Sequence, residues 1–333
     1  MTQENHTITR TNGAHNDLYQ AVTDRIIAAL ESGTPPWKQP WRSVEGKAGN
    51  MMPCNAITGR RYSGVNVLLL WMASAECGFH SHRWLTYRQA EAAGGHVKKG
   101  ELANFAILFK PFQVELQDKE GHPLLDEQGQ PIQAERAFIK HMPLFNIEQC
   151  DGLPDSIKGT PPSPLTDSSP PQTDEGAVDT QTFNRVMTMI NQTGVSFLSH
   201  PQNQAFYRPA TDQIVMPEHQ QFFTEADYWS TVLHELTHAT GHSLRLNRAG
   251  ITSTTRRFGD TVYGFEELIA EIGSAFLCTE LGIFGDVQHE SYLSSWLKTL
   301  KEDKHAIFRA SRFAREAFEY LIDHHGMAQQ SAA

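Results

Sequence analysis

The segment His234–His242, HELTHATGH, decides the fold of the C-terminal half of this chain. It carries two histidines four residues apart, His234 and His238, inside a run whose pattern predicts a helix. On a helix this spacing places both imidazoles on one face about one turn apart, where they can bind one Zn2+ ion. Glu235 lies beside them and is the candidate general base. We therefore predict a metal site here, against the alternative of two surface histidines on an ordinary helix.

The third metal ligand must come from elsewhere in the chain. A metzincin-type helix needs a histidine where this chain has Leu244, and His242 could share the ion only if the helix bends, because three histidines at successive turns span more than one ion accepts. The next predicted helix carries Glu267 and Glu271, four residues apart, and one of them would complete a gluzincin-type site. We favour Glu271, because small residues around it let the two helices approach closely. In the alternative Glu267 is the ligand and Glu271 orients a histidine, or both are exposed helix charges. The small residues are Ala270, Gly273, Ser274 and Ala275.

The chemistry expected of such a site is hydrolysis of a peptide bond. Water on Zn2+, or on another divalent ion such as Mn2+, attacks a carbonyl that the same ion polarises. Tyr263 and His242 are candidates for the donor that stabilises the oxyanion or for contacts that support a ligand. The predicted strand 213–216, QIVM, precedes the metal-binding helix and is expected to pair with an extended peptide.

Composition divides the chain into two domains. Residues 151–180 contain six prolines, three glycines and no aromatic residue, so we expect a flexible linker there between domains at 1–150 and 181–333. No apolar run is long enough for a membrane span, and the N-terminus is too polar for a signal peptide. The four cysteines are scattered, as in reduced proteins. These features favour a cytoplasmic protein with no membrane partner.

The pattern of apolar residues predicts an α+β fold. In the first domain we expect helices at 16–31, after the turn TGRRYSG and in WLTYRQAEAAGG, strands at 104–117 and in AFIKHMPLFNI, and a hairpin excursion at 118–135. In the second we expect a helix at 182–192, a hairpin at 205–217, the metal-binding helix opened by Thr224 and Asp227, and helices at 264–281 and 291–324.

The first domain combines positive charge with aromatic rings. The net charge of the chain is -10, yet residues 1–150 hold 15 basic and 15 acidic residues, and residues 33–110 hold ten basic against four acidic. Cations beside stacking rings are typical of proteins that bind single-stranded nucleic acid. In the alternative the tryptophans are core residues and the cations a solvated face. The candidate DNA-binding residues are Trp37, Lys38, Trp41, Arg42, Arg60, Arg61, Tyr62, Trp84, Tyr87, Lys98 and Lys99.

Motifs in both domains together resemble ArdC-type antirestriction proteins. In the first domain these are PPWKQPW, TGRRYSGVNVLLLW, WLTYRQA with GGHVKKGE, and LFNIEQCDGLP; in the second they are HELTHATGHSLRLNR and YGFEELIAEIGSAFLCTELGI. The resemblance implies an N-terminal single-stranded-DNA-binding domain followed by a zincin-like metallopeptidase domain. It also implies a plasmid-encoded protein that protects incoming DNA from restriction during conjugation. The HExxH motif of the family falls on His234, Glu235 and His238, and its EELxAE motif on Glu266, Glu267 and Glu271.

Two hypotheses about activity remain open from the sequence. In the first, a zinc-dependent metalloprotease is targeted to DNA and cleaves a restriction-modification subunit or another host protein. In the second, the first domain masks single-stranded DNA, and the zincin-like domain is structural or binds a partner without proteolysis.

Overall fold

The computed structural model describes residues 17–38, 51–117, 120, 122–126, 128–158, 177–252, 261–285 and 292–330. Helices and strands are mixed along the chain, which confirms the predicted α+β class. The helices are α1 (Leu18–Glu31), α2 (Val65–Cys77), α3 (Tyr87–Ala92), α4 (Asp155–Lys158), α5 (Thr180–Thr193), α6 (Glu225–Thr240), α7 (Ala249–Thr252), α8 (Thr261–Leu281), α9 (Leu293–Glu302) and α10 (Ala306–Gln330). The strands are β1 (Cys54–Asn55), β2 (Arg83–Leu85), β3 (His96–Val97), β4 (Asn104–Glu115), β5 (Gln133–Asn146), β6 (Cys150–Asp151), β7 (Ser196–Ser199), β8 (Phe206–Arg208) and β9 (Gln213–Met216). No helix in these ranges is long and apolar enough to cross a membrane.

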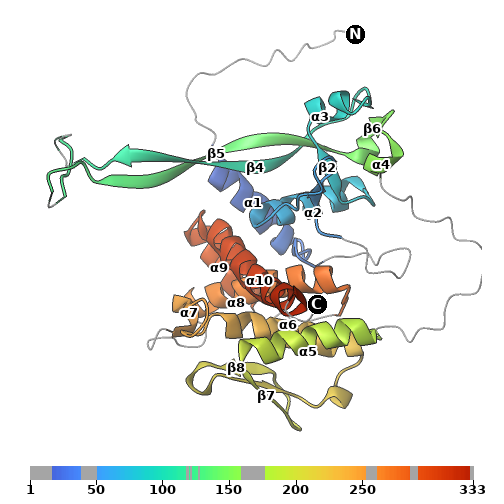
Figure 1. Cartoon of the computed structure of the whole chain (residues 1–333), viewed down its shortest axis with the longest axis vertical. Coiled ribbons are helices and arrows are strands. Elements are labelled where there is room, and N and C mark those ends of the chain that lie inside the picture. The colour runs from blue at the N-terminus through green and yellow to red at the C-terminus, as the bar shows by residue number, and fades with distance from the viewer. Residues whose placement is uncertain are drawn as a thin grey trace, which may run out of the picture.

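A long β-hairpin dominates the N-terminal part and extends away from the helices (Figure 1). Its strands β4 and β5 pair antiparallel from Asn104↔Leu144 to Glu115↔Gln133. Beyond this register, the isolated bridges Gln117↔Pro123 and Leu125↔Pro131 each close a short loop within the excursion predicted at 118–135. At its base the hairpin joins a four-stranded sheet in the order β1-β2-β5-β4.

The two domains share one apolar core. Helix α2 reads VNVLLLWMAS over its buried residues, and a helix that is apolar on all sides must be covered on all sides. It contacts β4 on one side and α10 of the C-terminal domain on another. Trp71 of α2 packs edge-on against Phe276 of α8, with ring centroids 5.8 Å apart, and Trp37 meets Trp296 of α9 at 5.6 Å. The domains are therefore joined by packing as well as by the chain.

The linker expected at 151–180 lies in part outside the described residues. Its beginning belongs to the packed N-terminal domain, because Asp151 pairs with His96 between β6 and β3 and Leu153 is only 2% exposed. Its last residue, Thr180, already begins α5. The ordered domains thus extend into both ends of the expected linker.

Helix α6 begins and ends as its sequence indicates. The Thr224 side chain accepts from the Asp227 backbone N–H and the Asp227 side chain accepts from the Thr224 backbone, which is the predicted capping box. Gly241 follows the last helical residue with an ordinary φ of -76°. The residue is small for a different reason: a Cβ there would lie 2.6 Å from Ile251 Cγ1 and 2.9 Å from Arg248 Nη2.

Helices α6 and α8 lie in direct contact. A Cβ on Gly273 of α8 would lie 2.6 Å from Cγ2 of Thr237 on α6, so this glycine sets how closely the helices approach. Gly273 therefore allows the close approach of the two helices that the small residues of α8 predicted.

Substitution of Gly273 by alanine is expected to lower the free energy of unfolding by up to about 2 kcal/mol. The overpacking cost is about 1–3 kcal/mol, and the better helix propensity of alanine returns about 1 kcal/mol. Thr237→Ser removes Cγ2 but keeps the hydroxyl that donates to Leu233 O at 2.8 Å. Denaturant unfolding of the double variant should therefore recover most of the loss; a double variant no more stable than Gly273→Ala would contradict this packing.

Candidate metal centre

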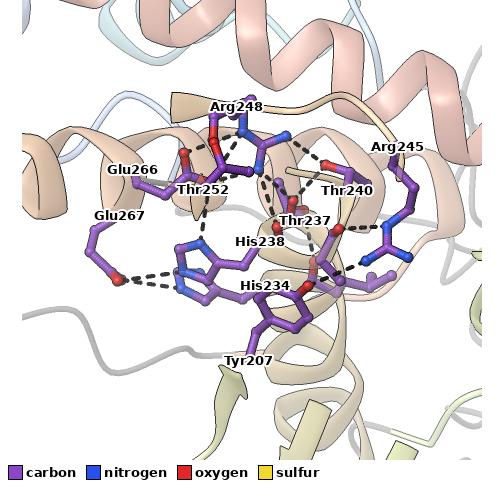
Figure 2. A network of polar contacts seen from close by, with 12 residues as sticks. Tyr207, His234, Thr237, His238, Thr240, Arg245, Arg248, Thr252, Glu266 and Glu267 are labelled. Carbon is purple, nitrogen blue, oxygen red and sulfur yellow. Dashed lines mark hydrogen bonds and ion pairs between the residues drawn. The ribbon is translucent and has the colours of Figure 1, made fainter. Parts of the chain in front are cut away.

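Two histidines and one glutamate converge between α6 and α8. His234 and His238 are 8% and 5% exposed, with ring centroids 4.9 Å apart. Glu267 reaches both, since its Oε2 lies 3.5 Å from His234 Nε2 and its Oε1 lies 3.5 Å from His238 Nε2 (Figure 2). In the described part of the chain, these three residues form the group that could hold a metal ion, with ligand atoms within 4.8 Å of one another. Two imidazoles and a carboxylate are a donor set typical of Zn2+.

Glu271 lies beside this group and not within it. Its Oε2 is 3.5 Å from Nδ1 of His234, the ring nitrogen on the side away from Glu267. The structure therefore favours the alternative, Glu267, over Glu271, because Glu267 lies at the Nε2 atoms of both histidines. The small residues around Gly273 mark where the helices touch, and this contact leaves little room for an ion. Glu267 lies further from Gly273 along α8 than Glu271 does.

The charges of the site fit a divalent cation. Four glutamates are buried here with exposures of 0–6%: Glu235, Glu266, Glu267 and Glu271. Among the described residues one buried arginine, Arg248, faces them, and it is paired with Glu266 at 2.6 Å. Buried carboxylates without compensating charge are costly. A divalent ion between the two histidines and Glu267 would supply that compensation.

Without a metal, the site holds protons in its place. Burial alone would lower the pKa of His238, but Glu267 and Glu266 outweigh burial and raise this pKa to about 9. Burial also opposes protonation of His234, yet Glu267 and Glu271 hold its pKa well above the ordinary value. Because a metal ligand must be the neutral imidazole, a metal displaces protons here, and its affinity weakens as pH falls below these pKa values.

Glu235 lies where a general base would act. It is 6% exposed, and burial raises the pKa of its carboxyl group. A backbone hydrogen bond from Tyr207 on β8 reaches this carboxyl, so the strand helps to orient it. The raised pKa suits a group that must take a proton and give it up again near neutral pH.

The two candidate oxyanion donors occupy different places. Tyr263 donates or accepts a hydrogen bond with the Tyr292 hydroxyl at 3.2 Å and also contacts Glu267. Burial, followed by the charge of Glu267, raises the pKa of the Tyr263 hydroxyl, which keeps it a donor. His242 is half-buried in the turn after α6, where its Nδ1 accepts the backbone N–H of Leu244 at 3.3 Å. This contact holds the turn after α6.

Two arginines of the turn after α6 were not singled out from the sequence. Arg248 donates to Glu266, and Arg245 binds Asp212 and donates to Ala239 O at 2.7 Å (Figure 2). The stretch LRLNR gives no periodic signal that its arginines are buried. Only the tertiary contacts reveal them.

The strand beside α6 with an open edge is β8, not the one expected. In the order β7-β9-β8, the predicted strand β9 is paired on both sides. β8 pairs with β9 alone within this described sheet, and it contacts α6. The expectation that strand 213–216 would pair with a peptide is therefore wrong, and β8 offers the edge.

The structure divides the candidate DNA-binding residues. Trp37 and Trp84 are 4% and 0% exposed, so they are core residues and cannot stack on bases, which corrects their assignment. Tyr62 packs partly buried against the cluster that contains Trp84. Arg61 pairs with Glu280 of α8 at 2.9 Å and so connects the domains. Trp41 and Arg42 lie outside the described residues.

The remaining candidates lie on the surface of the first domain. Tyr87 at the start of α3 is 50% exposed, and Arg60, Lys38 and Lys99 are exposed. Lys98 is half-buried and donates to Glu148 O at 2.8 Å. Asn55 and Gln89 are hydrogen-bonded at 3.1 Å, which ties the turn that carries Arg60 to α3.

Family models match both domains. Residues 16–145 match the N-terminal domain of the anti-restriction factor ArdC, and residues 184–313 match a zincin-like metallopeptidase. The second match agrees with the zinc-type donor set.

Whole-chain relatives carry both domains. Two forms of the DNA primase TraC of Escherichia coli are 37% identical over 316 residues, which cover 92% of this chain; the match spans 27% and 20% of those proteins, so this chain is about a quarter of their length. An uncharacterized protein of Sinorhizobium fredii, y4eC, is 32% identical and matches over 98% of this chain and 97% of its own length.

Solved structures give the same result. The metal-free crystal structure of the antirestriction protein ArdC from plasmid R388 has a TM-score of 0.70 and 36% identity, and covers 93% of this chain and 98% of that one. Its Mn(II)-bound structure has a TM-score of 0.68 and 35% identity over the same shares of the chains.

Glutamine substitutions should separate the roles of the two glutamates. Glu267→Gln removes a charged ligand and is expected to weaken Zn2+ binding at least about 100-fold, whereas Glu271→Gln, which alters only the contact to His234 Nδ1, should weaken it about 10-fold. Competition with a chromogenic chelator measures both. A larger loss in Glu271→Gln than in Glu267→Gln would restore Glu271 as the ligand.

Proposed function

We propose that this chain, which belongs to the family of ArdC-type antirestriction proteins, binds single-stranded DNA without sequence preference. It also carries a metal-dependent peptidase site, and through this site it protects incoming plasmid DNA from restriction during conjugation. The substrate of the peptidase is a protein close to the entering strand, such as a restriction-modification subunit. The observation that carries the enzymatic part is the buried Glu235 beside the His234–His238–Glu267 group.

The resident ion is Zn2+ or Mn2+. The donor set favours zinc, and the Mn(II)-bound structure of the R388 relative supports manganese as the alternative. When bound, the ion supplies Lewis-acid activation of water and of the scissile carbonyl. His234, His238 and Glu267 hold it.

The protein's own groups perform the remaining steps. Glu235 takes the proton of the attacking water and passes it to the leaving amine, which its raised pKa allows. The Tyr263 hydroxyl lies beside Glu267 and is the donor for the developing oxyanion. The open edge of β8 hydrogen-bonds the substrate backbone and holds the peptide along α6.

The DNA-binding surface that we propose consists of the exposed residues Arg60, Tyr87 and Lys99, whereas Lys98 is already bound to Glu148 O and Asp151. An exposed ring and nearby cations suit a single strand, whose unstacked bases are free to stack on tyrosine while phosphates meet lysine and arginine. The chain as a whole is acidic, so the attraction must be local.

The second candidate function is masking of single-stranded DNA without proteolysis. The shared core and the Arg61–Glu280 pair favour it, because they make the zincin-like domain part of the scaffold of the DNA-binding domain. A buried general base at the metal group is not needed for a scaffold, and it favours the peptidase.

Glu235→Gln distinguishes the two functions. The variant keeps its metal ligands and its DNA surface, so it should bind Zn2+ and single-stranded DNA like wild type. Under the peptidase hypothesis, transfer of unmodified plasmid DNA into a restricting recipient should lose its protection, since a lost general base slows catalysis about 100-fold or more. Protection equal to wild type would leave the masking function.

Salt titration tests the DNA surface. Binding to a mixed-sequence single strand should weaken steeply with salt, with a log–log slope of about -0.7 for each phosphate contacted. Arg60→Ala should make the slope shallower by about that amount. The matched control is Arg61→Ala. The guanidinium of Arg61 is already paired with Glu280, so the salt dependence of this variant should keep the wild-type slope. Equal effects of both substitutions would contradict the proposed DNA-binding surface.

A further inference from the structure

Arg248 is a buried cation that joins three parts of the metal domain. It is 4% exposed and lies in the turn between α6 and α7. Its Nη2 lies 2.6 Å from Glu266 Oε1 of α8, its Nη1 donates to Thr240 Oγ1 at 2.7 Å, and Nη2 also donates to Thr237 O at 2.8 Å (Figure 2). Arg248 thus binds the last turn of α6 to the helix that carries Glu267.

Space for this arginine and its partner is provided by two glycines. A Cβ on Gly241 would lie 2.9 Å from Arg248 Nη2, and a Cβ on Gly250 would lie 2.6 Å from Glu266 Oε2. Neither glycine has the positive φ that would explain it by backbone conformation. Both are explained by the close fit around the Arg248–Glu266 pair.

Glu266 meets His238 on the side away from the metal group. Its Oε1 lies 3.5 Å from His238 Nδ1, while Nε2 of the same ring faces Glu267 at 3.5 Å. An acceptor at Nδ1 keeps the ring proton there and leaves the Nε2 lone pair for a metal. The 0% exposed carboxylate of Glu266 is held in this position by the planar guanidinium of Arg248, which contacts both of its oxygens.

We propose that Arg248 and Glu266 are positioning residues of the metal centre, which fix the tautomer and ring orientation of His238. This inference rests on the proposed metal site. A purely structural pair would only hold the turn after α6 against α8. The two possibilities differ in what happens when the pair is replaced without loss of folding.

The decisive variant is R248M/E266M. Replacing a buried ion pair by apolar side chains of similar length removes both charges together and is often neutral or stabilising. The metal-free double variant should therefore melt at or above the wild-type temperature. Its affinity for Zn2+, measured by chelator competition, should fall about 10–100-fold because His238 loses its acceptor. The matched control is E280Q, which removes a charge at the far end of the same helix and should bind Zn2+ like wild type.

Each outcome decides a different point. If the folded double variant binds Zn2+ as tightly as wild type, the pair is structural and the positioning role is overturned. If wild type itself does not bind Zn2+, the metal site of the proposed function fails instead. If the double variant does not fold, R248M/E266Q takes its place, because it also removes both charges of the pair and leaves His238 an amide that is a weaker acceptor and is no longer held by a guanidinium. A Zn2+ affinity below that of wild type supports the role, and an unchanged affinity overturns it.

Discussion

The close contact of α6 with α8 is the constraint on which the rest of the structure depends. Gly273 lets α8 approach Thr237, and this approach encloses four glutamates and two histidines away from solvent. So many buried carboxylates are tolerated only where cations or protons compensate them. Arg248 compensates one of them, protonation of the two histidines or a divalent ion compensates two more, and burial raises the pKa of the fourth, Glu235, toward the neutral form. The same contact that packs the helices thereby creates the demand for a metal.

Helix α8 also connects this centre with the other domain. Its first half carries Glu266 and Glu267, and Glu280 near its end pairs with Arg61. In between, Phe276 packs against Trp71 of α2 within the shared core. The ion site and the candidate DNA surface are therefore parts of one packed body, which fits a protein that acts on targets close to bound DNA.

Local rules made much of this predictable from the sequence. The capping box at Thr224, the helical spacing of His234 and His238, and the small residues of α8 depend on neighbours along the chain, and the structure has all of them. The choice between Glu267 and Glu271 depended on where along α8 the two helices make contact, which spacing within one helix does not determine. The geometry consequently favours the alternative, Glu267, over the first choice.

Other features depend on tertiary contacts that leave no trace in a single sequence. Composition cannot separate a tryptophan that stacks on bases from one that packs in a core, and Trp37 and Trp84 are core residues. The burial of Arg248 depends on contacts that form after an irregular turn. The strand order that makes β8 an edge strand depends on pairing between separate segments of the chain.

The most direct test of the metal centre is anomalous diffraction at the zinc edge from crystals of the protein grown with Zn2+. We predict one peak about 2.0–2.2 Å from Nε2 of His234, Nε2 of His238 and a carboxylate oxygen of Glu267, with Glu271 outside the coordination shell. A peak bound by Glu271 in place of Glu267, or no peak between α6 and α8, would contradict it.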